Sequence, residues 1–138
     1  MKKIELIHPP EWPAAKGYSN GALVRGPTLY VAGQVGWNAQ QEFASDDLGE
    51  QFVQALDNVL AVVRAAGGEP ADVAKMTIYV TDLDAYRASL RVIGQAWRAR
   101  FGKHFPALAL VAVAGLVEPR AKVEIETIAA LSEKEPAP

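Results

Sequence analysis

An apolar stretch near the C-terminal end of the sequence, residues 105–130, most constrains the fold. The run from Ala107 to Leu116 contains no polar side chain, yet it is too short to span a bilayer, which needs about 20 residues. Its Val, Leu and Ala residues do not follow a 3.6-residue period, so we interpret it as a strand buried on both faces. This run therefore predicts the centre of the hydrophobic core.

The segment that follows alternates strictly between apolar and polar side chains. It begins after the turn residues Glu118 and Pro119 and runs over residues 121–127, a pattern typical of a strand with one buried face. One side holds Val123 and Ile125, and the other holds Lys122, Glu124 and Glu126. The sequence thus places two carboxylates on one face of a strand.

The composition fits one domain. The chain has 138 residues, 50% of them hydrophobic, which is enough for one core and too little for two. We expect a single domain over residues 1–131 and a disordered, solvated tail over residues 132–138. The formal net charge of −2 gives no long-range attraction for nucleic acid or anionic lipid, so we expect neither a nucleic acid nor a membrane partner.

Cysteine is absent, which excludes disulfides, a thiol nucleophile and a thiolate metal site. The two histidines, His8 and His104, are too few and too far apart in sequence to predict a zinc site. Glu5, His8 and the pair Pro9-Pro10 interrupt the N-terminus before an apolar signal segment can form. We therefore expect a cytoplasmic protein without a bound metal.

Local patterns predict the remaining elements. The expected strands are residues 4–7, 20–24, 28–35, 73–81, 107–116 and 121–127. Residues 20–24 and 28–35 flank Arg25-Gly26-Pro27, which favours a hairpin. One helix begins at Asp46 or Asp47 and ends at Gly67-Gly68; the other begins at Asp82 or Asp84 and ends at Gly102.

This order of elements predicts an α+β fold, with one mixed six-stranded sheet and two helices on one face. The chain offers no third helix for the other face of the sheet, although the run over residues 107–116 is apolar on both sides. We therefore expect other copies of the protein to cover that face, as in a homo-oligomer.

Two glycines, Gly33 and Gly36, bracket Gln34 near the end of the strand over residues 28–35. A glycine inside a strand indicates either a β-bulge or the close approach of another backbone or a ligand. The sequence leaves both interpretations open.

A series of short phrases resembles the RidA/YjgF family, also labelled L-PSP endoribonuclease-like, in order and spacing over nearly the whole chain. The phrases are Gly17-Tyr18-Ser19, Tyr30-Val31-Ala32-Gly33-Gln34, Gln54-Ala55-Leu56-Asp57-Asn58-Val59, Ala65-Ala66-Gly67-Gly68, Val80-Thr81-Asp82-Leu83, Phe105-Pro106-Ala107 and Val123-Glu124-Ile125-Glu126-Thr127-Ile128-Ala129. The resemblance implies a chorismate-mutase-like fold and a homotrimer whose sheets line an inner barrel. It also implies three small-molecule clefts between subunits. The best-known branch hydrolyses enamines and imines of the 2-aminoacrylate class to 2-oxo acids and ammonia there, without a cofactor.

The sequence departs from that branch at the position that grips the substrate. The family phrase Pro-Ala-Arg is Pro106-Ala107-Leu108 here, so the guanidinium that binds the substrate carboxylate is missing. An aliphatic chain cannot replace charge-assisted hydrogen bonds, which are worth roughly 1.5 to 3 kcal/mol each. Three further positions are less polar than usual in the family: Leu110 replaces a cysteine, Leu90 an asparagine and Ala32 a serine.

Other positions of the family's cleft are kept in this sequence: Tyr18, the Gly33-Gln34 backbone and the acid of the last strand, which the resemblance places at Glu124. A carboxylate there could position or activate water for attack on a carbon–nitrogen double bond. Alternatively, Glu124 pairs with Lys122, Arg120 or a neighbouring strand, and Glu126 on the same face shares both interpretations.

Two further residues are candidates for substrate binding. Trp37 follows the glycine pair where the family's cleft opens, so it is either a flat apolar wall for a ligand or a loop aromatic in a subunit contact. Arg120 lies in the Glu118-Pro119-Arg120 turn and is either a relocated cation or a surface arginine.

Three functions are therefore open. The first is a cofactor-free hydrolase or deaminase of a small imine or enamine that is not the usual 2-aminoacrylate. The second is a trimer that binds an apolar or uncharged ligand without chemistry. The third, a ribonuclease or translation inhibitor, is disfavoured by the acidic charge balance and the absence of a basic stripe.

Overall fold

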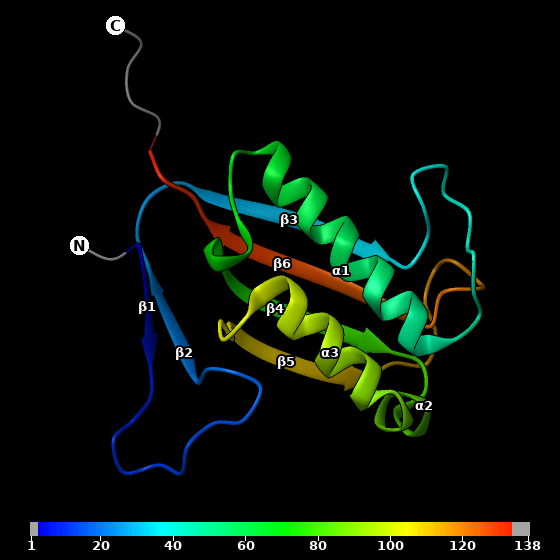
Figure 1. Cartoon of the computed structure of the whole chain (residues 1–138), viewed down its shortest axis with the longest axis horizontal. Coiled ribbons are helices and arrows are strands. Elements are labelled where there is room, and N and C mark those ends of the chain that lie inside the picture. The colour runs from blue at the N-terminus through cyan, green and yellow to red at the C-terminus, as the bar shows by residue number, and fades with distance from the viewer. Residues whose placement is uncertain (1–2, 134–138) are drawn as a thin grey trace, which may run out of the picture.

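The computed structural model describes residues 3–133, which form a sheet covered by helices on one face (Figure 1). The elements in chain order are β1 (Ile4–Ile7), β2 (Gly21–Val24), β3 (Thr28–Val35), α1 (Leu48–Ala65), the 3-10 helix η1 (Pro70–Asp72), β4 (Val73–Val80), α2 (Leu83–Ala88), α3 (Leu90–Phe101), β5 (Ala107–Ala112) and β6 (Val123–Ala130). The α+β class and the mixed sheet are confirmed.

The main sheet has four strands in the order β3-β6-β4-β5. Strand β6 runs antiparallel to both β3 and β4, whereas β4 and β5 run parallel. Helix α1 connects β3 to β4, and α2 and α3 connect β4 to β5 across the same face (Figure 1). Strands β3 and β4 run parallel, as do β4 and β5, and parallel strands of one sheet require such crossovers. The connections therefore place α1, α2 and α3 against one side of the sheet.

The prediction of a single six-stranded sheet is wrong. Strands β1 and β2 pair with each other in a separate two-stranded sheet, linked to β5 through a bridge between Ser19 and Ala107. The hairpin predicted between β2 and β3 is also wrong, because β3 pairs with β6 instead. In the turn between β2 and β3, Gly26 has a φ of +94°, and a Cβ at this position would lie 2.6 Å from the Leu131 carbonyl oxygen.

Helix α1 supplies the centre of the core. The Asp47 side chain caps its first turn by accepting a hydrogen bond from the Glu50 backbone N–H at 2.9 Å, as the sequence predicts. Most of its apolar stripe is buried, including Phe52, Leu56 and Leu60, whereas Val62 is exposed. These side chains pack against the β4 and β6 residues that face the helices, which include Met76, Ile78, Val123 and Ile125.

The second predicted helix is interrupted at Ser89, which separates α2 from α3. Asp82 caps α2 by accepting from the Ala85 N–H at 3.1 Å, so the predicted start is confirmed. The Ser89 hydroxyl donates to the Ala85 carbonyl oxygen at 2.8 Å, and its backbone N–H bonds to Tyr86. Serine competes in this way with regular helical bonding, which explains the break.

Strand β5 differs from its prediction in length and burial. It ends at Ala112 rather than Leu116, and it forms an edge of the sheet. Leu108 and Leu110 pack against the core, whereas Val111 on the other face is 45% exposed. Burial on both faces is therefore wrong for the single chain, because no described element covers the face of β5 that is turned away from the helices.

Within residues 3–133, no helix is both long and apolar enough to cross a membrane. Most of the tail predicted as disordered, residues 132–138, lies outside the described residues. Of its two described members, Ser132 accepts a hydrogen bond from the Lys3 ammonium at 3.3 Å.

Candidate functional site

Glu124 lies on the open face of the sheet, which we define as the face turned away from the helices. It pairs with Val35 of β3 on one side and with Tyr79 of β4 on the other. The β3–β6 register shifts between Val31 and Gln34, which marks a bulge that contains Gly33. The bulge interpretation of this glycine is therefore confirmed. A Cβ at Gly33 would lie 2.6 Å from Glu124 Oε2, so its close neighbour is a side chain rather than another backbone or a ligand.

The two acids on this face differ in their partners. The Tyr79 hydroxyl donates to Glu126 Oε1 at 2.6 Å. That bond to an anion raises the pKa of Tyr79, and the nearby Glu124 adds to the effect. Within residues 3–133, no hydrogen bond or ion pair joins Glu124 to another side chain. The ion pair with Lys122 or Arg120 that the sequence left open is absent there.

Leu108 lies on the opposite side of the sheet from Glu124. It pairs with Met76, whose side chain is buried in the core, so Leu108 also points toward the helices. There it lines a hollow of about 280 Å³, the helix-side groove, between α3 and β5. The groove is walled by Leu90, Trp97, Arg98, Phe105 and Leu108, with Gly17 beside them.

Tyr18 is held next to this groove. The Ser19 backbone N–H donates to the Pro106 carbonyl oxygen at 2.9 Å, and the Ser19 hydroxyl donates to Phe105. These bonds fasten the segment before β2 to the segment before β5. Tyr18 itself is 41% exposed and lies between Gly17, which lines the groove, and Ser19.

Trp37 and Arg120 meet in a third place, a pocket of about 490 Å³ between the loops that follow β3 and precede β6. The rings of Trp37 and Phe43 are 5.8 Å apart, and the Arg120 guanidinium lies 5.6 Å from the centroid of Phe43. Arg120 Nε also donates to Asp46 Oδ1 at 3.0 Å, and this bond lowers the pKa of Asp46. We call this hollow the loop pocket.

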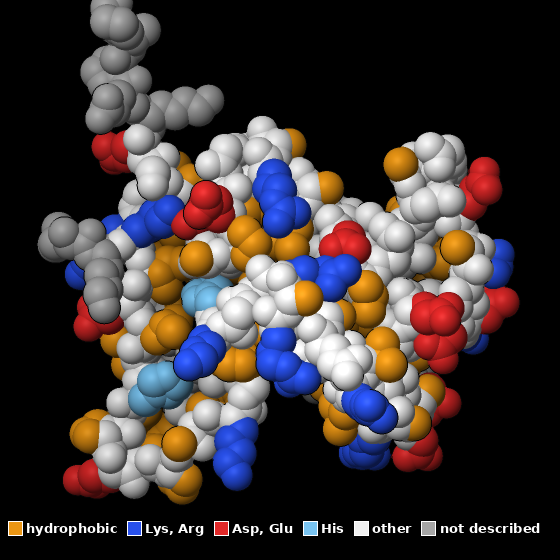
Figure 2. Space-filling model, viewed as in Figure 1, with side chains coloured by type: hydrophobic (Ala, Val, Ile, Leu, Met, Phe, Trp, Pro, Cys, Tyr) orange, Lys and Arg blue, Asp and Glu red, His pale blue; other side chains and the backbone are white. Residues whose placement is uncertain are grey.

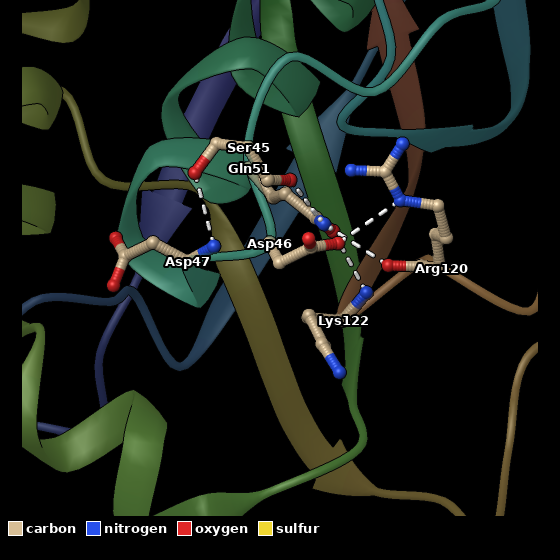
Figure 3. A network of polar contacts seen from close by, with 6 residues as sticks. All are labelled: Ser45, Asp46, Asp47, Gln51, Arg120 and Lys122. Atoms are coloured by element: carbon tan, nitrogen blue, oxygen red, sulfur yellow. Dashed lines mark hydrogen bonds and ion pairs between the residues drawn. The ribbon is translucent and has the colours of Figure 1, made fainter.

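A buried amide holds the loop pocket in place (Figure 3). Gln51 on α1 is 1% exposed, and its Nε2 donates to the carbonyl oxygens of Ser45 at 2.8 Å and Arg120 at 3.0 Å. Its Oε1 accepts from the Lys122 backbone N–H at 2.8 Å. One side chain therefore joins α1 to both loops and to the start of β6.

A second amide fixes the end of β3. Asn58 Nδ2 donates to the carbonyl oxygens of Val35 at 2.9 Å and Trp37 at 2.7 Å. Between them, a Cβ at Gly36 would lie 2.4 Å from the Gln51 carbonyl oxygen. Gly36 therefore allows the close approach of α1 to the strand end, which is the second of the two interpretations left open.

The structure thus groups the predicted site residues in three places: Gly33 with Glu124, Tyr18 with Leu108, and Trp37 with Arg120. The place that holds Gly33 and Glu124 is near the place that holds Trp37 and Arg120, because Trp37 comes shortly after Val35, the cross-strand partner of Glu124. Leu108 and Glu124 do not meet within one chain, since they lie on opposite faces and β4 separates their strands.

Three residues of these sites were missed by sequence reasoning. Gln51 carries a usable signal, because it is a polar residue at a core position of an amphipathic helix. Arg98 follows Leu90 and Gly94 at helical spacing and so shares their face. Tyr79 gave no signal, since its contact with Glu126 depends on strand pairing.

Within the described residues, His, Asp and Glu side chains form no group of three or more that could hold a metal ion. The fold and the gathered side chains define an α+β protein whose candidate reactive group is a carboxylate beside a glycine bulge. The endoribonuclease L-PSP family model matches residues 10–131. The chain belongs to this family, which is also known as RidA/YjgF.

Related proteins cover nearly the whole chain. A 2-iminobutanoate/2-iminopropanoate deaminase from Dermatophagoides farinae is 33% identical over 129 residues, which cover 93% of this chain and 97% of the relative. The protein of the same name from Escherichia coli K12 is 35% identical and covers 85% and 90%.

Two solved structures agree in fold. The Rid family protein YyfB from Yersinia pestis superposes with a TM-score of 0.84 at 32% identity, covering 94% of this chain and all (100%) of that one. Escherichia coli TdcF with bound serine gives a TM-score of 0.69 at 32% identity, covering 93% and 99%. The predicted family is therefore confirmed.

Proposed function

We propose that this chain forms a cytoplasmic homotrimer that hydrolyses the carbon–nitrogen double bond of a small imine, or of an enamine after tautomerisation, without a cofactor. The products are a carbonyl compound and ammonia. The substrate differs from 2-aminoacrylate, because Leu108 occupies the position at which the family's best-known branch has its arginine. Curated relatives at about one-third identity are named as imine deaminases, which supports the reaction class.

One observation carries the proposal: Glu124 is held against Gly33 on the open face and has no partner among residues 3–133. A carboxylate already tied to a cation or a hydroxyl would be less available to accept a proton. Glu126, one strand period away, is tied in this way to Tyr79. We therefore assign the role of general base to Glu124 rather than Glu126.

The proposed steps balance as follows. The imine nitrogen first takes up a proton from solvent. Glu124 accepts a proton from water as the water oxygen attacks the imine carbon, giving a neutral carbinolamine, and then passes this proton to the amino group. The carbon–nitrogen bond breaks as Glu124 accepts the proton of the carbinolamine hydroxyl, so the carbonyl forms, ammonia leaves, and Glu124 returns the last proton to solvent. Each step needs only water and a positioned carboxylate.

We propose that the cleft is shared between copies. Leu108 lines the helix-side groove, and Tyr18 follows Gly17 of its wall, whereas Glu124 lies on the open face. One molecule can therefore contact both places only if they come from two chains. Trp37 and Arg120 lie at the end of the sheet nearest Glu124, and we place them in the wall of the same cleft. The guanidinium of Arg120 is engaged by Asp46 and Phe43, which suits a wall better than a free cation.

The test is ammonia release from imines generated in situ by an amino-acid oxidase. We expect the wild-type protein to accelerate release from imines with apolar side chains, and Glu124→Gln to lower kcat at least 100-fold, within the usual range for loss of a general base. Glu126→Gln is the matched control, because it changes an acid on the same strand and face. An equal loss in both variants, or wild-type protein without any acceleration, would contradict the proposal.

A second candidate function follows from the apolar groove. Leu108, Leu110 and Leu90 replace residues that are polar in the best-known branch, which favours a trimer that binds a ligand without converting it. In that case Glu124→Gln would bind the same ligand as tightly as the wild type, and neither would release ammonia.

A further inference from the structure

We infer that Arg98 binds the carboxylate of a ligand whose apolar body, aromatic or branched aliphatic, occupies the helix-side groove. This inference rests on the proposed function, since it names the class of imino acid that the cleft would accept. The cation then stands on α3 rather than on β5, where the family's arginine would be.

The groove is walled by large rings in fixed positions. Trp97 stacks on Phe101 with centroids 4.2 Å apart, and it lies nearly parallel to Phe105 at 6.1 Å with an interplanar angle of 2°. Trp97 Nε1 donates to the His104 carbonyl oxygen at 3.1 Å, which fixes the indole. A preformed apolar wall of this kind favours a flat or branched hydrocarbon group over a small polar one.

Arg98 is the cation that lines this groove. A Cβ at Gly94 would lie 3.4 Å from its Nη1, so the guanidinium leans back along α3 over the glycine, toward Leu90. Figure 2 shows basic side chains over α3, with apolar side chains visible between them. Gly94 therefore keeps the space beside the groove open for the guanidinium.

Arg100 and Arg87 have partners, whereas Arg98, like Arg91 on the same helix, has none in the part of the chain that the structure describes. Arg100 contacts Asp57 through Nε at 2.6 Å and Nη2 at 3.0 Å, and Arg87 lies 3.6 Å from Asp84. An unpaired guanidinium beside an apolar hollow is suited to a carboxylate, because its planar fork can donate two parallel hydrogen bonds.

The charge and the apolar wall together define the ligand. With the carboxylate at Arg98, the space beside Leu108 and Leu90 receives the side chain of the imino acid. A one-carbon side chain would leave that apolar surface uncovered. The arrangement thus selects 2-imino acids with large apolar side chains over 2-iminopropanoate.

Binding of stable 2-oxo acids, measured by calorimetry on the full chain, tests this inference. The probes are 3-phenyl-2-oxopropanoate, its uncharged amide, and 2-oxopropanoate. We expect the aromatic acid to bind wild-type protein most tightly. Arg98→Gln should weaken its binding about 10- to 100-fold and leave binding of the amide within about twofold. Arg91→Gln on the same helix, outside the groove, should change neither.

Two further variants complete the test. Leu108→Arg should tighten binding of 2-oxopropanoate and weaken binding of the aromatic acid, because it places a charge on the groove wall. Glu124→Gln should bind the aromatic acid as tightly as the wild type. If the wild-type protein releases no ammonia but shows this binding pattern, hydrolysis is refuted and the role of Arg98 is supported. The inference is overturned if no 2-oxo acid binds, if Arg98→Gln and Arg91→Gln behave alike, or if 2-oxopropanoate binds as tightly as the aromatic acid.

Discussion

Gly33 and Glu124 are sterically coupled: a methyl group on Gly33 would lie 2.6 Å from Glu124 Oε2 and 2.8 Å from its carboxyl carbon. The carboxylate is the far end of a flexible side chain, so it can move away while the sheet remains intact. The glycine therefore fixes where the proposed base stands.

Gly33→Ala is accordingly expected to lower imine hydrolysis about 10- to 100-fold, because a misplacement of about 1 Å has effects of this size. Its melting temperature should stay close to that of the wild type. Gly21→Ala is the control, since a Cβ there would meet only ordinary contact with Ile7 at 3.5 Å. Full activity in Gly33→Ala would contradict the assigned role of Glu124.

Gln51 should matter for stability. Gln51→Met removes three hydrogen bonds and leaves the Lys122 N–H and two carbonyl oxygens without their partner. We expect the free energy of unfolding to fall by roughly 2 to 4 kcal/mol, measured by urea denaturation at one protein concentration. Gln54→Met, which breaks only a bond to Asn58, should cost less than about 1 kcal/mol. Equal losses would show that the buried network is not the cause.

The phenol of Tyr79 provides a test of the open face by titration. Its raised pKa comes first from the bond to Glu126, because ionisation would place two anions together. Glu126→Gln should therefore lower the pKa of Tyr79 toward the ordinary value of 10.0, followed by tyrosinate absorbance with Tyr79→Phe as the reference. The pKa of Tyr79 is higher in the folded than in the unfolded protein. The contact therefore stabilises the fold fully below the unfolded pKa of about 10, and this stabilisation is lost as the pH rises through the folded pKa. A Tyr79 pKa that does not respond to the substitution would refute the contact.

Arg120 has the opposite effect on its partner, because its hydrogen bond lowers the pKa of Asp46 below the ordinary 3.8. Arg120→Gln should raise that pKa, as seen by nuclear magnetic resonance titration of the Asp46 carboxyl carbon. The pair contributes to stability above the unfolded pKa of Asp46, and this contribution is lost as the pH falls through the folded pKa. Both side chains are exposed, so the effect on stability should be small. Arg91→Gln should leave the titration unchanged.

The sequence predicted best what local patterns determine. The apolar stripe and the cap at Asp47 correctly predicted helix α1. The alternation over residues 121–127 correctly placed Glu124 and Glu126 on one face. The prediction of strand pairing was wrong, because pairing depends on segments that are distant in sequence. Strand β3 pairs with β6, which lies about a hundred residues further along the chain, rather than with β2. The break at Ser89 was missed because it depends on one hydroxyl bond inside a continuous apolar pattern.

The candidate site was predictable only in part. Gly33 and Glu124 were named from sequence, and the structure brings them together. The proximity of Trp37 and Arg120 could not be predicted, since it depends on two loops that Gln51 joins from a buried position. The separation of Leu108 from Glu124 required the strand order, which no local pattern contains.

Our central claim is that each cleft combines the groove of one copy with Glu124 of another. Two variants, Glu124→Gln and Leu108→Trp, should each be inactive alone, the first without a base and the second with a filled groove. Co-expressed in equal amounts with different tags and purified as mixed trimers, they should recover about one third of wild-type ammonia release, because one of the three clefts in every mixed trimer receives both intact halves. Mixed trimers no more active than their parents would contradict the shared cleft.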